Sequence, residues 1–116
     1  MQKYTGSCHC GAVRYEAEAD LSSVITCNCS HCVMKGLLLV FIPAEQFILL
    51  SGEESLTEYL FNQKIIHHLF CKHCGVQSFG RGTGKEGVPT VALNVRCLEG
   101  VDIANLSLRA YDGKSR

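Results

Sequence analysis

The chain has 116 residues, of which 47% are hydrophobic, and its eleven basic side chains balance eleven acidic ones. This length and composition predict a single globular domain over residues 1–116, and no apolar run reaches the roughly eighteen residues that a membrane span needs. The zero net charge removes the basic surface expected of a protein that binds nucleic acid or an anionic membrane.

Cysteine usage is the most unusual feature of the composition, with eight cysteines in the chain. The first residues, Met1 to Thr5, show no apolar segment of the kind found in secretory signals, so a cytoplasmic location is the expectation. In that reducing compartment, metal ligation or catalysis is favoured over disulfide formation as the reason for so many cysteines.

Short stretches with strand character alternate with turn residues along the chain. The predicted strands are residues 12–17, 24–26, 37–42, 56–61, 65–70, 90–95 and 106–111. Residues 37–42 are continuously apolar, so this strand is expected to be buried on both faces. Residues 44–47 allow a single helical turn, and no helical pattern extends beyond about two turns. These features predict a mainly β domain of antiparallel sheet with little helix.

Two segments are predicted to be loops. Asn62-Gln63-Lys64 lies between two predicted strands and has the length of a hairpin loop. Residues 80–87 contain four glycines, which predicts a mobile loop. This segment is not a phosphate-binding P-loop, because an acidic residue rather than Ser or Thr follows Gly84-Lys85. A plain surface loop is the favoured interpretation, and a loop whose Arg81 and Lys85 side chains bind a carboxylate is the alternative.

Four cysteines fall into two short pairs, each followed by glycine. Cys71-x-x-Cys74-Gly75 has the spacing at which two sulfur atoms reach one metal ion, and the glycine accepts a tight left-handed turn. Cys8-x-Cys10-Gly11 ends in the same way, and alternate residues of an extended chain face the same side. The two pairs together predict one structural zinc site with four thiolate ligands. Four buried free thiols or two disulfides are the alternative.

Three further cysteines, Cys27, Cys29 and Cys32, lie within six residues, and no glycine follows the last of them. Their spacing compels no fourth ligand. The candidates for that ligand are Cys97, His9, His31, His67, His68 and His73. A second structural zinc completed by one of these side chains is one alternative, and an iron–sulfur cluster is another.

If none of these candidates reaches the metal, Cys27, Cys29 and Cys32 hold a zinc ion with one position left for an exogenous ligand, as in catalytic zinc sites. A thiol that enters this position loses its proton because the metal stabilises the anion, and the thiolate remains a nucleophile at neutral pH. The predicted chemistry is therefore the making or breaking of a carbon–sulfur bond.

The remaining cysteine and the histidines carry weaker signals. Cys97 is interpreted as a small buried hydrophobic residue, with a redox nucleophile as the alternative if Arg96 lowers its pKa. The adjacent residues His67–His68 point to opposite faces of a predicted strand, so at most one of them can address a given site. The histidines inside the metal loops, His31 and His73, are favoured for supporting or solvent-facing roles over ligation.

The order and spacing of the cysteine motifs resemble those of the glutathione-dependent formaldehyde-activating enzyme family. The matching segments span nearly the whole chain and are Gly6-Ser7-Cys8-His9-Cys10-Gly11-Ala12-Val13, Cys27-Asn28-Cys29-Ser30-His31-Cys32, Phe70-Cys71-Lys72-His73-Cys74-Gly75 and Asn94 to Asp102. The resemblance implies a mainly β fold similar to the beta-tent zinc proteins. It also implies two zinc ions, a structural one on Cys8, Cys10, Cys71 and Cys74 and a catalytic one on Cys27, Cys29 and Cys32.

The resemblance further implies an activity. The family's reaction is the reversible addition of the glutathione thiol to formaldehyde, which gives S-hydroxymethylglutathione. The function expected from it is a zinc-dependent carbon–sulfur lyase whose partners are a small thiol such as glutathione and a small aldehyde, with no nucleic acid or membrane involved. The alternative is a non-catalytic zinc module that binds a protein partner through a sheet edge or an apolar face.

Overall fold

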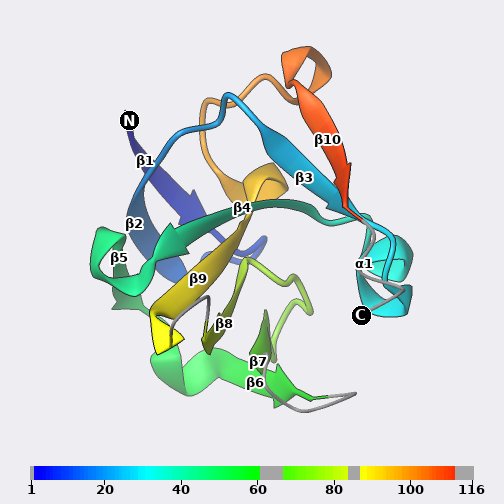
Figure 1. Cartoon of the computed structure of the whole chain (residues 1–116). Coiled ribbons are helices and arrows are strands. Elements are labelled where there is room, and N and C mark those ends of the chain that lie inside the picture. The colour runs from blue at the N-terminus through cyan, green and yellow to red at the C-terminus, as the bar shows by residue number, and fades with distance from the viewer. Residues whose placement is uncertain (1, 61–66, 84–86, 112–116) are drawn as a thin grey trace.

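The computed structural model describes residues 2–60, 67–83 and 87–111, so the predicted hairpin loop at residues 62–64 lies outside the described residues. The strands are β1 Gln2–Ser7, β2 Arg14–Ala19, β3 Val24–Cys27, β4 Leu38–Pro43, β5 Phe47–Ser51, β6 Leu56–Tyr59, β7 His67–Cys71, β8 Phe79–Thr83, β9 Pro89–Asn94 and β10 Leu108–Tyr111. They form a three-stranded sheet, β1-β2-β5, and a seven-stranded sheet, β10-β3-β4-β9-β8-β7-β6 (Figure 1). The prediction of a mainly β fold is confirmed.

Helical structure is scarce in the described part of the chain. Its one α-helix is α1, Ser30–Lys35, which lies beside the ends of β3 and β10 (Figure 1). The 3₁₀ turns are Ala44–Gln46, Glu53–Ser55, Val95–Cys97 and Ile103–Asn105, and the first of them is the turn predicted at residues 44–47. None of the helices described here has the length and apolar character needed to cross a membrane.

Strand pairing is antiparallel with one exception among the described strands. β10 runs parallel to β3, with Leu108 opposite Val24 and Tyr111 opposite Cys27. The antiparallel sheet expected from the sequence therefore includes one parallel pair, at this edge. A parallel pair requires a long connection between its strands, and the chain from β3 to β10 supplies one by passing through most of the seven-stranded sheet first.

The prediction of a mobile loop at residues 80–87 is wrong at its start, because residues 80–83 belong to β8. Gly80 pairs with His68 of β7 and with Ala92 of β9. A Cβ atom on Gly80 would lie 3.2 Å from the carbonyl oxygen of His67, so the glycine permits close contact between neighbouring backbones. Strands β1 and β5 were also not predicted from the sequence pattern.

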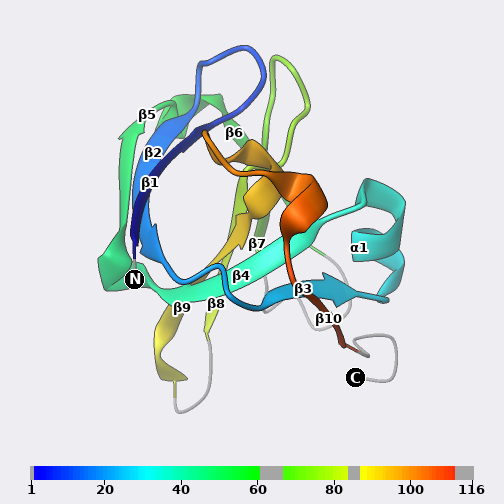
Figure 2. The same cartoon turned by 90° about the horizontal axis from the view of Figure 1, so that it is seen from above.

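The main hydrophobic core lies between the two sheets, which Figure 2 shows curving around a common interior. Three aromatic rings meet there: Tyr15 of β2 lies 5.1 Å from Phe47 of β5 and 5.6 Å from Phe79 of β8, and the two phenylalanine rings are 4.6 Å apart. The Tyr15 hydroxyl donates to the carbonyl oxygen of Ser78 at 3.4 Å, which satisfies its buried polar end. These contacts join the two sheets.

A second, smaller core lies on the opposite face of the seven-stranded sheet. Leu39 and Ala92 belong to it, whereas their strand neighbours Val40 and Val91 belong to the main core, as the alternation of side chains along a strand requires. Cys32 of α1 packs in this cluster. The helix covers only the first part of β4, so Phe41 is 52% exposed and the prediction of burial on both faces fails there.

Gly52 is a position where only glycine fits, because its φ is 92° and an added Cβ would lie 2.7 Å from the Cα of Val13. We expect Gly52→Ala to lower the free energy of unfolding by more than about 2 kcal/mol. Gly100→Ala is the matched control, since Gly100 has a φ of 74° with open space around it. Thermal unfolding followed by circular dichroism compares them, and equal losses would show that close contact with the backbone of Ala12 and Val13 costs nothing.

Candidate functional site

Four cysteine side chains meet where the loop after β1 approaches the end of β7. The sulfur atoms of Cys8, Cys10, Cys71 and Cys74 all lie within 4.8 Å of one another. Cys10 Sγ is 3.6 Å from Cys8 Sγ and 3.7 Å from Cys71 Sγ. A disulfide would bring two sulfur atoms to about 2.05 Å, so this group consists of free thiols. The structure thus brings together the four cysteines that spacing had paired.

The geometry of this four-cysteine group fits a tetrahedral zinc ion. Zinc–sulfur bonds of about 2.3 Å place the sulfur atoms of a tetrahedral site about 3.8 Å apart. The two distances from Cys10, 3.6 and 3.7 Å, are close to that value. Cys71 and Cys8 are buried, at 0% and 3% exposure, so a metal held here would be anchored in the main core.

Each cysteine pair of the four-cysteine group is followed by a glycine with positive φ, Gly11 at 84° and Gly75 at 79°, as the Cys-Gly endings predicted. The N–H of Val13 donates to Cys8 Sγ at 3.3 Å. The expected reason for convergence of the first pair was wrong, since Cys8 and Cys10 meet through a turn rather than along an extended chain. In that turn the Gly11 N–H donates to the Cys8 carbonyl oxygen at 3.3 Å.

The thiols of this group differ in how readily they ionise. Burial acts to raise the pKa of Cys74, but hydrogen bonds from the N–H groups of Val76 and Cys10 and from neighbouring thiols lower it to about 6. For Cys10 the N–H of Ala12 acts to lower the pKa, yet burial and the neighbouring thiols raise it to about 11. Cys74 therefore ionises readily at neutral pH, whereas Cys10 does not. A bound cation would favour the thiolate form of both side chains.

The other three cysteines gather around the start of α1. Cys27 ends β3, Cys29 precedes the helix, and Cys32 lies in its first turn. Their sulfur atoms all lie within 4.8 Å of one another, and Cys32 is 7% exposed. Within residues 2–60, 67–83 and 87–111, no other Cys, His, Asp or Glu joins this three-cysteine group. None of the six candidates for a fourth ligand is therefore brought to it.

Helix α1 holds the three-cysteine group through its two ends. Cys29 Sγ accepts the N–H of Cys32 at 3.3 Å and so caps the first turn. At the other end Gly36 has a φ of 63°, its N–H donates to Val33, and the Leu37 N–H donates to Cys32, which is a Schellman motif. A helix of six residues is too short to show helical periodicity in the sequence. Gly36 at its C-terminal end was the only signal that could have predicted it.

A cavity of about 330 Å³ opens beside the three-cysteine group. Its lining residues come from the end of β3, from α1 and from β10, and they are Thr26, Cys27, Asn28, Val33, Ala110 and Tyr111. The N–H of Asn28 donates to the carbonyl oxygen of Tyr111 at 3.1 Å, which fixes β10 as one wall. No local sequence pattern predicts this wall, because it depends on the parallel pairing of β10 with β3.

Two cations flank the C-terminal end of α1. Lys35 Nζ donates to Gln77 Oε1 at 3.1 Å and lies 5.1 Å from the centre of the Phe70 ring. Arg96 Nε donates to the carbonyl oxygen of Gly36 at 3.0 Å. Partial burial lowers the pKa of Lys35 from its usual range. The helix that carries Cys32 is therefore bordered by positive charge, which favours an anionic ligand.

The two adjacent histidines of β7 point to opposite faces, as predicted. His67 Nδ1 lies 2.6 Å from a Glu58 carboxylate oxygen. The His68 ring packs 4.1 Å from that of His31, which stacks on Tyr59 at 5.7 Å. His68 therefore packs against α1 through the ring of His31, and neither histidine joins the three-cysteine group.

Burial of His68, together with the charges of His31, Lys35 and His67, lowers its pKa to about 4. In the unfolded chain His68 takes up a proton below about pH 6.5, whereas in the native state it does so only near pH 4. The stability of the native state therefore falls as the pH drops through this window. We expect wild type to lose about 3 kcal/mol of unfolding free energy across this window, and His68→Gln to lack that loss. Protonation of the cysteines that would hold metal affects both proteins equally, so the comparison isolates His68. Chemical denaturation at pH 7 and pH 4.5 compares the two, and a His68 NMR titration near pH 6.5 would contradict the expectation.

Cys97 lies outside both cysteine groups. The side-chain amide of Asn94 donates to its sulfur at 3.6 Å. Burial is the main reason that the pKa of Cys97 is raised. A thiol that is hard to ionise is a poor nucleophile, which supports the interpretation of Cys97 as a packing residue, here partly buried, over the redox alternative.

Comparisons with known proteins agree with this architecture. The family described as glutathione-dependent formaldehyde-activating enzyme matches residues 3–106, which include all eight cysteines. A crystal structure of a Rhodobacter sphaeroides protein, a structural genomics target, shares 28% sequence identity and superposes with a TM-score of 0.79. That similarity covers 90% of this chain and 99% of the other. The chain therefore belongs to the glutathione-dependent formaldehyde-activating enzyme family.

Proposed function

We propose that this protein is a zinc-dependent carbon–sulfur lyase that reversibly adds the thiol of glutathione, or of a closely related small thiol, to formaldehyde. The observation that carries the proposal is the three-cysteine group, which has no fourth protein ligand among the described residues and borders a cavity. Membership of the family supports the choice of thiol and aldehyde. We also propose that the two sheets form a beta-tent and that the protein works in the reducing cytoplasm, where its thiols persist.

The two cysteine groups have different roles in this proposal. Cys8, Cys10, Cys71 and Cys74 would hold a structural zinc, because four ligands close the coordination sphere. Cys27, Cys29 and Cys32 would hold the catalytic zinc, which when bound supplies a positive charge that stabilises the anion of an incoming thiol. Burial of Cys32 and the N–H bond to Cys29 Sγ keep these side chains in position before substrate arrives.

The reaction itself needs no oxidant or reductant. The substrate thiol gives up its proton, its sulfur forms a bond to the carbonyl carbon of formaldehyde, and the carbonyl oxygen takes up a proton to become a hydroxyl. The reverse step breaks the carbon–sulfur bond and returns both substrates. The chain contributes orientation, because the cavity wall formed by β10 confines the aldehyde on the side of Cys27.

Charge around the site supports glutathione as the thiol. Glutathione is an anion at neutral pH, and Lys35 and Arg96 place two cations at one end of α1. The cavity beside Cys27, at about 330 Å³, has room for the thiol-bearing part of the molecule together with formaldehyde. The rest of the tripeptide would then extend over the exposed surface of α1.

The direct test is the rate of exchange between free formaldehyde and its glutathione adduct, measured by ¹³C exchange spectroscopy with labelled formaldehyde. Protein loaded with zinc at both groups should raise that rate at least about tenfold above the uncatalysed reaction. Replacing glutathione by its S-methyl derivative should abolish the effect. An unchanged exchange rate with both metals present would refute the formaldehyde reaction.

The alternative, a non-catalytic zinc module, has one observation in its favour. Two neighbouring apolar side chains on α1 are highly exposed: Val33, which lines the cavity, at 61% and Met34 at 86%. Such an apolar pair suits a protein partner as well as a substrate. Val33→Ser with Met34→Ser would separate the two functions, because a substrate role predicts a raised KM for glutathione, whereas a docking role leaves the exchange kinetics unchanged.

A further inference from the structure

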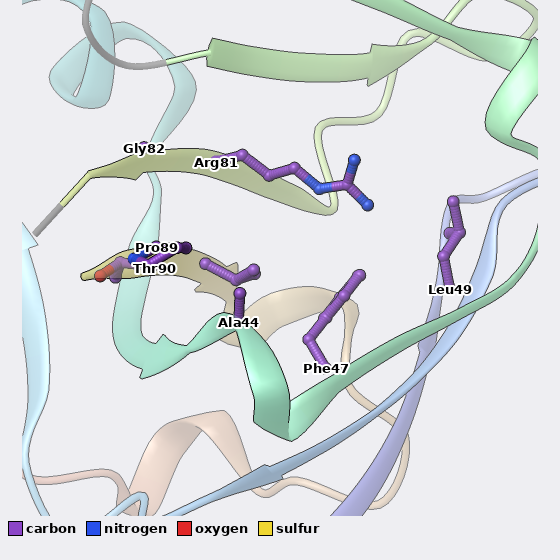
Figure 3. Close-up of a pocket in the computed structure, with 8 residues that line it drawn as sticks. Ala44, Phe47, Leu49, Arg81, Gly82, Pro89 and Thr90 are labelled. Atoms are coloured by element: carbon purple, nitrogen blue, oxygen red, sulfur yellow. The ribbon is translucent and has the colours of Figure 1, made fainter. Parts of the chain in front are cut away.

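A second cavity, of about 220 Å³, lies between the two sheets (Figure 3), and no cysteine lines it. Its lining is mostly apolar, with Arg81 as the one charged side chain, and consists of Ala44, Phe47, Leu49, Arg81, Gly82, Pro89, Thr90 and Val91. It shares no lining residue with the cavity beside Cys27. Neither the proposed lyase reaction nor either metal group uses it.

The two cavities lie on opposite faces of the seven-stranded sheet. Arg81 pairs with Val91, so both side chains are on the same face, and Val91 belongs to the main core. Ala92, the next residue, belongs instead to the smaller core beneath α1. A ligand held by Arg81 is therefore separated from the three-cysteine group by the sheet itself.

Arg81 is held as an oriented cation at this cavity. Its guanidinium lies 5.4 Å from the centre of the Phe79 ring and 5.9 Å from that of Phe47. Figure 3 shows its side chain reaching from β8 toward the side of the cavity where Phe47 and Leu49 lie. Within the described residues no hydrogen bond or ion pair engages the guanidinium, so its N–H edge is available, and that edge matches a carboxylate in two parallel hydrogen bonds.

No acidic side chain in the described part of the chain neutralises Arg81. The ion pairs found there join Lys3 to Glu16, Arg14 to Glu99 and His67 to Glu58. His67 is the residue opposite Arg81 in β7, and it already holds the Glu58 carboxylate at 2.6 Å. A cation at the edge of an apolar cavity, with its neighbouring acid engaged elsewhere, is complementary to an anion that has an apolar body.

We propose that this cavity binds a small monocarboxylate with a compact apolar body, the carboxylate on Arg81 and the body between Phe47, Leu49 and Val91. An apolar cavity of about 150 Å³ accepts benzene, so a cavity of about 220 Å³ accommodates benzoate. The fixed fork of Arg81 selects the carboxylate over a neutral amide of the same shape. The site is independent of the lyase reaction and of any metal.

The test titrates benzoate and benzamide into the zinc-loaded, ¹⁵N-labelled full chain. Benzoate should shift the amide resonances of Ala44, Gly82 and Thr90 in a saturable way, and benzamide should bind at least about tenfold more weakly. Arg81→Met should weaken benzoate binding by a similar factor, whereas Arg109→Met removes the same charge from exposed β10 and should change nothing. Ala44→Leu, which keeps Arg81 and fills the cavity, should also weaken binding.

Three results would overturn the proposal: equal affinity for benzoate and benzamide, unchanged benzoate binding in Arg81→Met, or shifts confined to residues around Cys27. If Arg81→Met fails to fold, Arg81→Lys decides the matter, because it keeps the charge and loses the two-bond geometry. The amide spectrum of Arg81→Lys shows whether this variant is folded. If folded Arg81→Lys bound benzoate as tightly as wild type, the role proposed for the guanidinium would be rejected.

Discussion

Cys71→Ser should lower the melting temperature of the zinc-loaded protein by more than about 10 °C. Cys71 is fully buried, and its sulfur belongs to the group that joins the loop after β1 to the end of β7. Structural zinc contributes about 10–16 kcal/mol of binding free energy in small peptides, so a lost ligand costs several kcal/mol of folding free energy. A domain of this size has only about 5–15 kcal/mol in total.

The matched control for this prediction is Cys97→Ser, which makes the same atomic change at a partly buried thiol outside both groups. We expect a shift of no more than about 5 °C for that variant. Thermal unfolding followed by circular dichroism gives the melting temperatures, and mass spectrometry gives the zinc content. If Cys71→Ser kept its full zinc content and had the same melting temperature as Cys97→Ser, the four-cysteine group would not be a structural metal site.

Cys29→Ser should reduce the rate of formaldehyde–glutathione exchange to that of the uncatalysed reaction while the fold survives. Cys29 Sγ accepts the Cys32 N–H at the start of α1, and serine is among the best residues for that capping position. The substitution therefore removes a thiolate ligand and preserves the helix. The expected change in melting temperature is less than about 5 °C.

Two further variants separate ligand loss from helix loss at this position. Cys29→Ala removes both the ligand and the cap, and should add about 1 kcal/mol of destabilisation to the same loss of activity. Ser30→Ala, at the neighbouring exposed position, should leave exchange kinetics and zinc content at wild-type values. Wild-type exchange rates in Cys29→Ser, with two zinc ions per chain still bound, would exclude the three-cysteine group from the chemistry.

The grouping of the cysteines was accessible from the sequence because metal ligation imposes short-range rules. Two sulfur atoms that share an ion must be close along the chain or lie in a tight turn, and Gly11 and Gly75 both adopt the positive φ that such turns use. Spacing also isolated Cys27, Cys29 and Cys32 as a separate set. The assignment of metals and roles to these sets stays a prediction.

Features that depend on distant pairing were not accessible from local patterns. The glycines of β8 indicated a loop, but contacts with β7 and β9 make Gly80 part of a strand. Tyr111 gave no sign of bordering the site, since its place there follows from pairing with Cys27 far along the chain. Helix α1 was missed because six residues produce too little periodicity.

The parallel pairing of β10 with β3 sets an order of events during synthesis on the ribosome. Cys27, Cys29 and Cys32 emerge together and need no distant residue to gather, so they can capture a metal ion early. The wall that Ala110 and Tyr111 provide is translated only after every other strand described here. A nascent chain would therefore present the three-cysteine group to cellular thiols before Ala110 and Tyr111 enclose it.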